Sequence, residues 1–132
     1  MTQTNMVTVL DHIHAMRRRD FDDIPHRLHP DVVHQGVLDD LICVDRDQVL
    51  GNMLGSLETT EFGIERLELI DAGERVVVGL GGPRFRDVPY VPLLGQIYIV
   101  YTLRDDRIVR MDDYLTRAEA LTAAGATSPD WI

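Results

Sequence analysis

Asp113 is the residue whose type and setting most clearly suggest chemistry, because it lies in a segment that otherwise alternates like a β-strand. Regular alternation over 108–115 would place one set of residues on a shared face: Val109, Met111, Asp113 and Leu115. The opposite face would carry Ile108, Arg110, Asp112 and Tyr114. The first set is more apolar, so we expect it to face the interior, where an unpaired carboxylate has a raised pKa and could act as a general base. The structural alternative is that Asp113 accepts hydrogen bonds from Arg117 or from backbone N–H groups at the start of the last helix.

Three further side chains could bind or transfer protons. His34 shares a strand face with Val32, and imidazole can shuttle a proton near neutral pH, although a core histidine bonded to a neighbour is the alternative. His12 lies about 90° from the centre of the apolar stripe of its helix, which predicts a rim position and a solvated or capping histidine. Tyr101 shares a face with Ile99, where core packing is more typical than proton donation, although its hydroxyl needs a partner in either case.

Two patterns that could indicate metal or phosphate binding do not hold up. Four potential ligands lie close in sequence, namely His26, His29, Asp31 and His34. Zinc would need three or four of them to converge, and Pro30 with its turn disfavours that geometry. The glycine-rich segment 79–82 leads to Pro83 rather than to a helix, which is unlike a phosphate-binding loop. We therefore expect no metal site and no cofactor.

The first half of the chain predicts helices around one short strand. Apolar residues at helical spacing indicate a helix over 5–19: Met6, Val9, Leu10, Ile13 and Met16. A short second helix starts at Asp20, with Pro25 in its first turn, and a strand over 32–37 follows. After a polar loop, Asp45 is placed to cap a third helix, with Gln48 as its reciprocal partner.

The second half changes to the two-residue period of strands. A half-exposed strand around 67–69 leads through a turn at 71–74 into Val76-Val77-Val78, which should be buried on both faces. A long surface loop over 79–95 precedes strands at 96–103 and 108–115, and a helix over 116–124 is capped by Gly125. This order predicts an α+β fold with helices gathered on one side of a curved antiparallel sheet.

Composition restricts the function classes. A chain of 132 residues is expected to form one domain, 1–132, and its net charge of −9 argues against a nucleic-acid partner. No apolar run approaches the roughly 20 residues that cross a bilayer, so no membrane partner is expected. A single cysteine and the lack of a signal-like N-terminus fit a cytoplasmic protein.

Three segments carry a resemblance to a known superfamily. They are Pro30-Asp31-Val32-Val33-His34-Gln35-Gly36, Leu69-Ile70-Asp71-Ala72-Gly73-Glu74-Arg75-Val76-Val77-Val78, and Asp113-Tyr114-Leu115-Thr116-Arg117-Ala118-Glu119-Ala120-Leu121. Together with the element order, they resemble the NTF2-like fold, in particular an uncharacterised bacterial subgroup of the SnoaL-like families. The resemblance implies a cone whose sheet curls around a cavity for a small apolar molecule, and a homodimer through the opposite sheet face.

Enzymes of this superfamily place their functional groups at recognisable positions. The aspartate base of ketosteroid isomerases corresponds to Gly36, and their two oxyanion-binding groups correspond to His12 and Ile99, of which His12 alone could donate a hydrogen bond. In hydrolases similar to limonene-epoxide hydrolase, Asp113 carries over, but the arginine and the other aspartate fall near Leu80 and Gly82. Their tyrosine and asparagine positions correspond to His34 and Gly36. SnoaL-type cyclases use an Asp–His pair, which Asp113 could form with His34 or His12.

Two functional hypotheses follow. The first is a cofactor-free acid–base enzyme, of the isomerase, cyclase or epoxide-hydrolase type, acting on a small apolar molecule. In it, Asp113 is the base, His34 is the partner acid, and His12 or Tyr101 binds the substrate oxygen, while the ligand site is lined by Val32, Ile99, Tyr101 and Met111. The second is a non-catalytic module for small-ligand binding or dimerisation, which the missing isomerase base and the incomplete hydrolase set favour.

Overall fold

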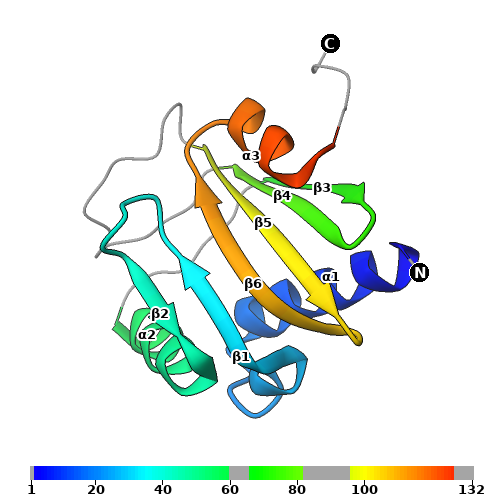
Figure 1. Cartoon of the computed structure of the whole chain (residues 1–132). Helices are drawn as coiled ribbons and strands as arrows, with labels where there is room; N and C mark the ends of the chain where they lie inside the picture. Colours follow the sequence, from blue (N-terminus) through cyan, green and yellow to red (C-terminus); the bar gives the residue numbers. More distant parts are fainter. Residues whose placement is uncertain (1, 60–65, 82–95, 127–132) are drawn as a thin grey trace.

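A six-stranded sheet with helices on both faces forms the body of the domain (Figure 1). The computed structural model describes residues 2–59, 66–81 and 96–126. Within them the strand order is β2-β1-β6-β5-β4-β3, and neighbouring strands are antiparallel except β1 and β6, which are parallel. The sheet is therefore mixed and open at β2 and β3, with the predicted antiparallel meander as its larger part.

Helix α1 (Thr2–Arg18) covers one face of the sheet, and it is rotated relative to the predicted stripe. Its most buried side chains are Val9, His12, Ile13 and Ala15, whereas Leu10 is only half-buried. The small Ala15 side chain, fully buried, lets this flank approach the sheet, and the large apolar residues alone did not reveal it. The prediction that His12 lies at the rim is therefore wrong, because His12 lies in the middle of the buried face.

A short 3-10 helix, η1 (Ile24–Arg27), holds Pro25 in its first turn as predicted, and it leads directly into β1 (Leu28–Gln35). β1 starts four residues earlier than expected. The short strand β2 (Ile42–Val44) pairs antiparallel with β1, within a segment that we predicted as loop. Three residues with two exposed apolar side chains give too little alternation to indicate a strand.

Helix α2 (Asp45–Thr59) starts with the predicted reciprocal cap. The Asp45 carboxylate accepts from the Gln48 backbone N–H at 3.0 Å, and the Gln48 side-chain oxygen accepts from the Val44 N–H at 3.0 Å. Two N–H groups at the start of the helix are thereby satisfied. Gln48 reaches one residue before Asp45, so the second bond also ties the helix to the end of β2.

Strands β3 (Arg66–Ala72) and β4 (Arg75–Gly81) form the outer hairpin of the meander. Val76, Val77 and Val78 are all fully buried, which confirms that β4 is covered on both faces. Val76 and Val78 belong to the core under α1, and Val77 belongs to a second core on the other face. The predicted loop over 79–95 is wrong at its start, because 79–81 continue β4, and 82–95 lie outside the described residues.

Strands β5 (Gln96–Arg104) and β6 (Arg107–Tyr114) pair antiparallel, with a register shift near their turn. Thr102 pairs with Arg110 but Leu103 pairs with Ile108, so β6 carries one extra residue at this point. Ile108 and Met111 consequently face the same core, and both are buried. The predicted alternation is right for Met111 and Asp113 but wrong for Ile108, because the bulge reverses it.

Helix α3 (Arg117–Ala124) closes the described chain on the face opposite α1. Thr116 caps its start by accepting from the Glu119 N–H, and Gly125 ends it with a left-handed φ of 66°. Its apolar side packs on the second core, made of Val77, Tyr98, Val100, Ala120 and Ala124. The expectation that all helices gather on one side is therefore wrong for α3, which lies across β4 and β5 in Figure 1.

No helix in the described part of the chain is long and apolar enough to cross a membrane.

Candidate functional site

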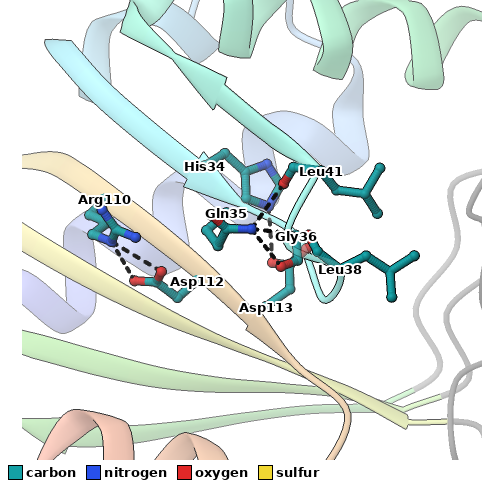
Figure 2. Close-up of polar contacts among 8 residues, drawn as sticks. All are labelled: His34, Gln35, Gly36, Leu38, Leu41, Arg110, Asp112 and Asp113. Atoms are coloured by element: carbon teal, nitrogen blue, oxygen red, sulfur yellow. Dashed lines mark hydrogen bonds and ion pairs between the residues drawn. The ribbon is translucent and has the colours of Figure 1, made fainter.

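An imidazole–carboxylate pair joins the two parallel strands of the sheet (Figure 2). His34 Nε2 lies 2.9 Å from Asp113 Oδ1, and the two side chains are 25% and 10% exposed. Because β1 and β6 are parallel, both residues lie near the same end of the sheet, although 79 positions separate them in the sequence. The pair that the sequence suggested is thus brought into direct contact.

Asp113 favours the charged form of His34. Burial alone would lower the pKa of His34, but the hydrogen bond to Asp113, its charge and the charge of Asp112 together raise that pKa above 6.5. The contact with Asp113 therefore makes His34 easier to protonate than an ordinary histidine. Such a pair holds a base and an acid within one hydrogen bond of each other.

The contacts do not favour the alternative that Asp113 accepts hydrogen bonds from Arg117 or from the start of the last helix. Arg117 donates instead to Glu68, at 3.2 and 3.3 Å, and the start of α3 is capped by Thr116. Asp113 is hydrogen-bonded to His34, which lies 79 positions earlier in the sequence on the neighbouring strand β1. The carboxylate is therefore held by another titratable group rather than by the helix that follows it.

His12 is a second buried histidine, and its environment differs sharply. Its side chain is fully buried, and neither ring nitrogen has a hydrogen-bond partner among the described residues. Burial, with smaller contributions from the positive charges of Arg27 and His34, lowers the pKa of His12 to about 4. Its ring meets Tyr101 edge to face, with centroids 5.8 Å apart and planes at 69°. His12 is therefore a neutral imidazole with unused hydrogen-bonding capacity inside the core.

The remaining predicted site residues line the same side of the sheet. Val32, Tyr101 and Met111 are buried in the α1-side core, and Ile99 packs against it. Ile99 pairs directly with Asp113 across β5 and β6, and Met111 pairs with His34 across β6 and β1. Burial and the charge of Asp113 raise the pKa of the Tyr101 hydroxyl, which therefore stays protonated. The fold thus gathers all seven predicted residues on one wall, with His12 near the pair but not bonded to it.

Asp113 also borders a cavity of about 250 Å³ at the ends of β1 and β6. Its lining comprises Gln35, Gly36, Val37, Asp39, Asp112, Asp113, Tyr114, Leu115 and Glu119. Neither His12 nor Tyr101 contributes to that lining. The carboxylate is therefore reachable from the rim of the sheet, while the two aromatic donors lie deeper inside.

Sequence reasoning did not identify the residues that shape this rim. The Gln35 side-chain amide donates to the carbonyls of Gly36, Leu38 and Leu41 at 3.2, 3.0 and 3.4 Å, and so holds the loop after β1 (Figure 2). Gly36 is needed here, since a Cβ would lie 2.7 Å from the Leu41 Cβ. The sequence shows Gly36 only as a missing base, because nothing in it signals that the chain folds back on this position.

The histidine-rich segment does not assemble a metal site. His29 Nδ1 accepts from the Asp31 backbone N–H at 3.0 Å, and His34 bonds Asp113. In the described part of the chain, no three His, Cys, Asp or Glu side chains come together in a way that could hold a metal ion.

Comparison with known structures identifies the architecture. An NTF2-like protein from Burkholderia xenovorans superposes with a TM-score of 0.70 at 19% identity, over 94% of this chain and 97% of the other. The chain has the NTF2-like fold. A candidate polyketide cyclase from Pseudomonas putida matches with a TM-score of 0.67 at 14% identity, over 89% and 94% of the two chains. A candidate ketosteroid isomerase from Kribbella flavida matches with a TM-score of 0.64 at 14% identity, over 85% and 77%.

No protein-family model and no curated protein sequence matches this chain. At these identities the NTF2-like neighbours establish the fold alone. The function must therefore be argued from the site.

Proposed function

We propose that this NTF2-like protein is a cofactor-free acid–base enzyme that uses the His34–Asp113 pair on a small, largely apolar molecule. The observation that carries the proposal is the 2.9 Å contact between His34 and Asp113, two half-buried titratable groups of which Asp113 borders a cavity. Candidate cyclases and a candidate isomerase among the structural neighbours are consistent with this reaction class.

In the proposed reaction, Asp113 removes a proton from the substrate. Oδ1 of its carboxylate stays bonded to His34, and Oδ2 takes the proton from a carbon next to a carbonyl or from a water molecule. The imidazolium of His34 gives its Nδ1 proton to the oxygen on which negative charge develops. The pair then holds a neutral acid and a neutral imidazole. Asp113 returns its proton to a new position on the substrate while the oxygen-bound proton goes back to Nδ1 of His34, which restores both charges of the pair.

His12 and Tyr101 are the proposed oxygen-binding donors. A neutral imidazole can donate one N–H without the cost of a buried charge, and a protonated phenol can do the same. Their position behind the pair requires the substrate to enter the core past Asp113. The partner that His12 lacks would then be supplied by the substrate oxygen.

An assay that does not require the natural substrate tests the His34–Asp113 pair directly. 5-Nitrobenzisoxazole loses its carbon-bound proton to a base as its N–O bond breaks, which gives a coloured phenolate. We expect the Asp113→Asn variant to lose about 100-fold in this rate, the usual size of a general-base contribution. Asp112→Asn is the matched control, because Asp112 lines the same cavity but bonds Arg110 on the surface. Equal rates for the wild-type protein and Asp113→Asn would refute the proposal, provided that both melt at similar temperatures.

A non-catalytic binding module is the second candidate, and one observation favours it. The α1-side core is filled by buried apolar residues from α1, β1, β4, β5 and β6, so a ligand must displace side chains to reach His12. A protein that only binds would show ligand-induced shifts around His12 and no dependence of the nitrobenzisoxazole rate on Asp113. The same assay therefore separates the two candidates.

The homodimer through the sheet face and the cytoplasmic location stay predictions. Exposed apolar side chains on β2 support the first, since Ile42 and Val44 are 47% and 46% exposed on the strand that pairs with β1. Helix α3 covers β4 and β5 on the face opposite α1, so a sheet-face dimer would use the end near β1 and β2. Sedimentation of a Val44→Lys variant would test this, with a shift toward monomer as the expected result.

A further inference from the structure

A second cavity, larger than the one that Asp113 borders, lies away from the His34–Asp113 pair, at the ends of β3, β4 and β5. Its volume is about 620 Å³, within the range of about 300–1,000 Å³ that is usual for small-ligand sites. It is lined by Arg66, Leu67, Glu68, Gly79, Leu80, Gly81 and Tyr98. Alternation along the strands places most of these residues on the face opposite α1, since Tyr98 belongs to the core under α3. This cavity is therefore separate from the proposed reaction site.

Two glycines beside this cavity let neighbouring side chains lie close against the strands. A Cβ on Gly79 would lie 2.8 Å from the Tyr98 ring, and a Cβ on Gly81 would lie 3.1 Å from the Arg66 Cβ. The Tyr98 ring forms an aromatic wall, while Leu67 and Leu80 border the cavity with side chains that belong to the core on the α1 side. The shape and chemistry suit a flat or slender apolar group lying against the strands.

The charges around the cavity favour an anion. Glu68 is neutralised by Arg117, with N–O distances of 3.2 and 3.3 Å between side chains that are 18% and 14% exposed. Arg66 is exposed and forms no ion pair with any residue that the structure describes. Among the described residues around the cavity, two guanidinium groups and one carboxylate sum to +1, on a chain whose net charge is −9. Burial and Glu68 also raise the pKa of the Tyr98 hydroxyl, so it adds no negative charge.

We propose that this cavity is a second binding site, which takes a small monocarboxylic acid with an aromatic or aliphatic tail. The tail lies along the strands against Tyr98, and the carboxylate bonds the Arg66 guanidinium at the mouth, a geometry in which arginine can donate two parallel hydrogen bonds. The proposal does not depend on catalysis by the His34–Asp113 pair.

NMR titration of the intact protein with benzoate, 4-phenylbutyrate and octanoate tests the site. We expect amide shifts at Leu67, Gly79, Gly81 and Tyr98 with at least one acid, and weaker binding of the corresponding neutral amide. Arg66→Gln should weaken binding of the acid about tenfold or more and leave binding of the amide unchanged, because a charge-assisted bond is lost. Asp113→Asn should leave both affinities unchanged, which separates this site from the proposed function.

Arg75→Gln is the matched control, since Arg75 is an exposed arginine on the adjacent strand at the far end of the hairpin. An equal loss in Arg66→Gln and Arg75→Gln would mean that overall charge drives the effect, and would overturn the proposal. So would the absence of shifts at the four lining residues with all three acids.

Discussion

Two histidines on the same side of the sheet, one half-buried and one fully buried, have pKa values shifted in opposite directions. His34 lies at the end of β1, bonded to Asp113, and its pKa is raised above 6.5. His12 lies in the middle of α1, with no partner for either ring nitrogen in the described chain, and its pKa is lowered to about 4. Burial acts on both in the same direction, so the difference comes mainly from the bond and charge of Asp113 at His34, with smaller contributions from Asp112 there and from positive charges near His12.

The comparison shows how one fold can supply two kinds of hydrogen-bond donor at one wall. At His34 the protonated form is favoured and can release a proton, whereas the neutral His12 can polarise an oxygen without giving up its proton. A buried polar group without a partner is unusual in folded proteins and reduces stability. We therefore interpret His12 as a functional group whose partner arrives with the ligand.

The largest expected effect comes from removing the unpartnered imidazole. His12→Leu should stabilise the protein by about 1–3 kcal/mol at neutral pH, because an unsatisfied buried polar group is replaced by an apolar one. The substitution should also remove a loss of stability in acid. The unfolded chain protonates His12 below pH 6.5, whereas the folded chain does so only near pH 4. That loss amounts to about 3 kcal/mol as the pH falls from 6.5 to about 4.

Chemical denaturation across this pH range measures both effects, with His14→Leu as the control on the same helix. A His12→Leu variant that is less stable than the wild-type protein at neutral pH would show that His12 makes a favourable bond in the unliganded protein. The interpretation of His12 as waiting for a ligand would then fail.

A smaller effect is expected at the paired histidine. Because the pKa of His34 is raised in the folded protein, protonated His34 stabilises the fold below pH 6.5. This contribution disappears as the pH rises through the folded-state pKa. The Asp113→Asn variant lacks the carboxylate that raises the pKa of His34. Burial should then lower that pKa and reverse the way in which His34 makes stability depend on pH. The variant should lose about 1–2 kcal/mol relative to the wild-type protein near pH 5.5 and less near pH 8. Thermal melts at both values check this, and a constant difference would contradict it.

The smallest effect should follow from the charge beside His12. Arg27 contributes to lowering the pKa of His12, although burial dominates. Arg27→Gln should therefore move the acid unfolding transition of the protein slightly toward lower pH, because a His12 pKa closer to 6.5 leaves a smaller difference between the folded and unfolded chain. Arg27 also bonds Asp23 at 2.6 Å, so Arg18→Gln, which loses a longer contact to the same carboxylate, is the appropriate comparison. Identical acid transitions in the two variants would mean that the Arg27 charge does not reach His12.

The sequence predicted the meander, the Asp45 cap and the His34–Asp113 side of the sheet because each depends on local periodicity or on alternation over a few residues. It missed β2, because three residues carry too little pattern, and it placed Ile108 on the wrong face, because a bulge is a property of two paired strands. It misplaced His12, because the rotation of α1 is set by the small Ala15 at the sheet. The cavity lined by Arg66 and Tyr98 was not predicted, since it depends on Tyr98 packing over Gly79 of the neighbouring strand.

The most direct test of this account is an NMR titration that follows the ring nitrogens of both histidines in one sample. The account predicts that His34 loses its proton above pH 6.5, and that His12 stays neutral until about pH 4. In Asp113→Asn, the His34 transition should fall below 6.5 while that of His12 moves little. Two transitions near 6.5, or a His34 transition that ignores the Asp113 substitution, would contradict the account.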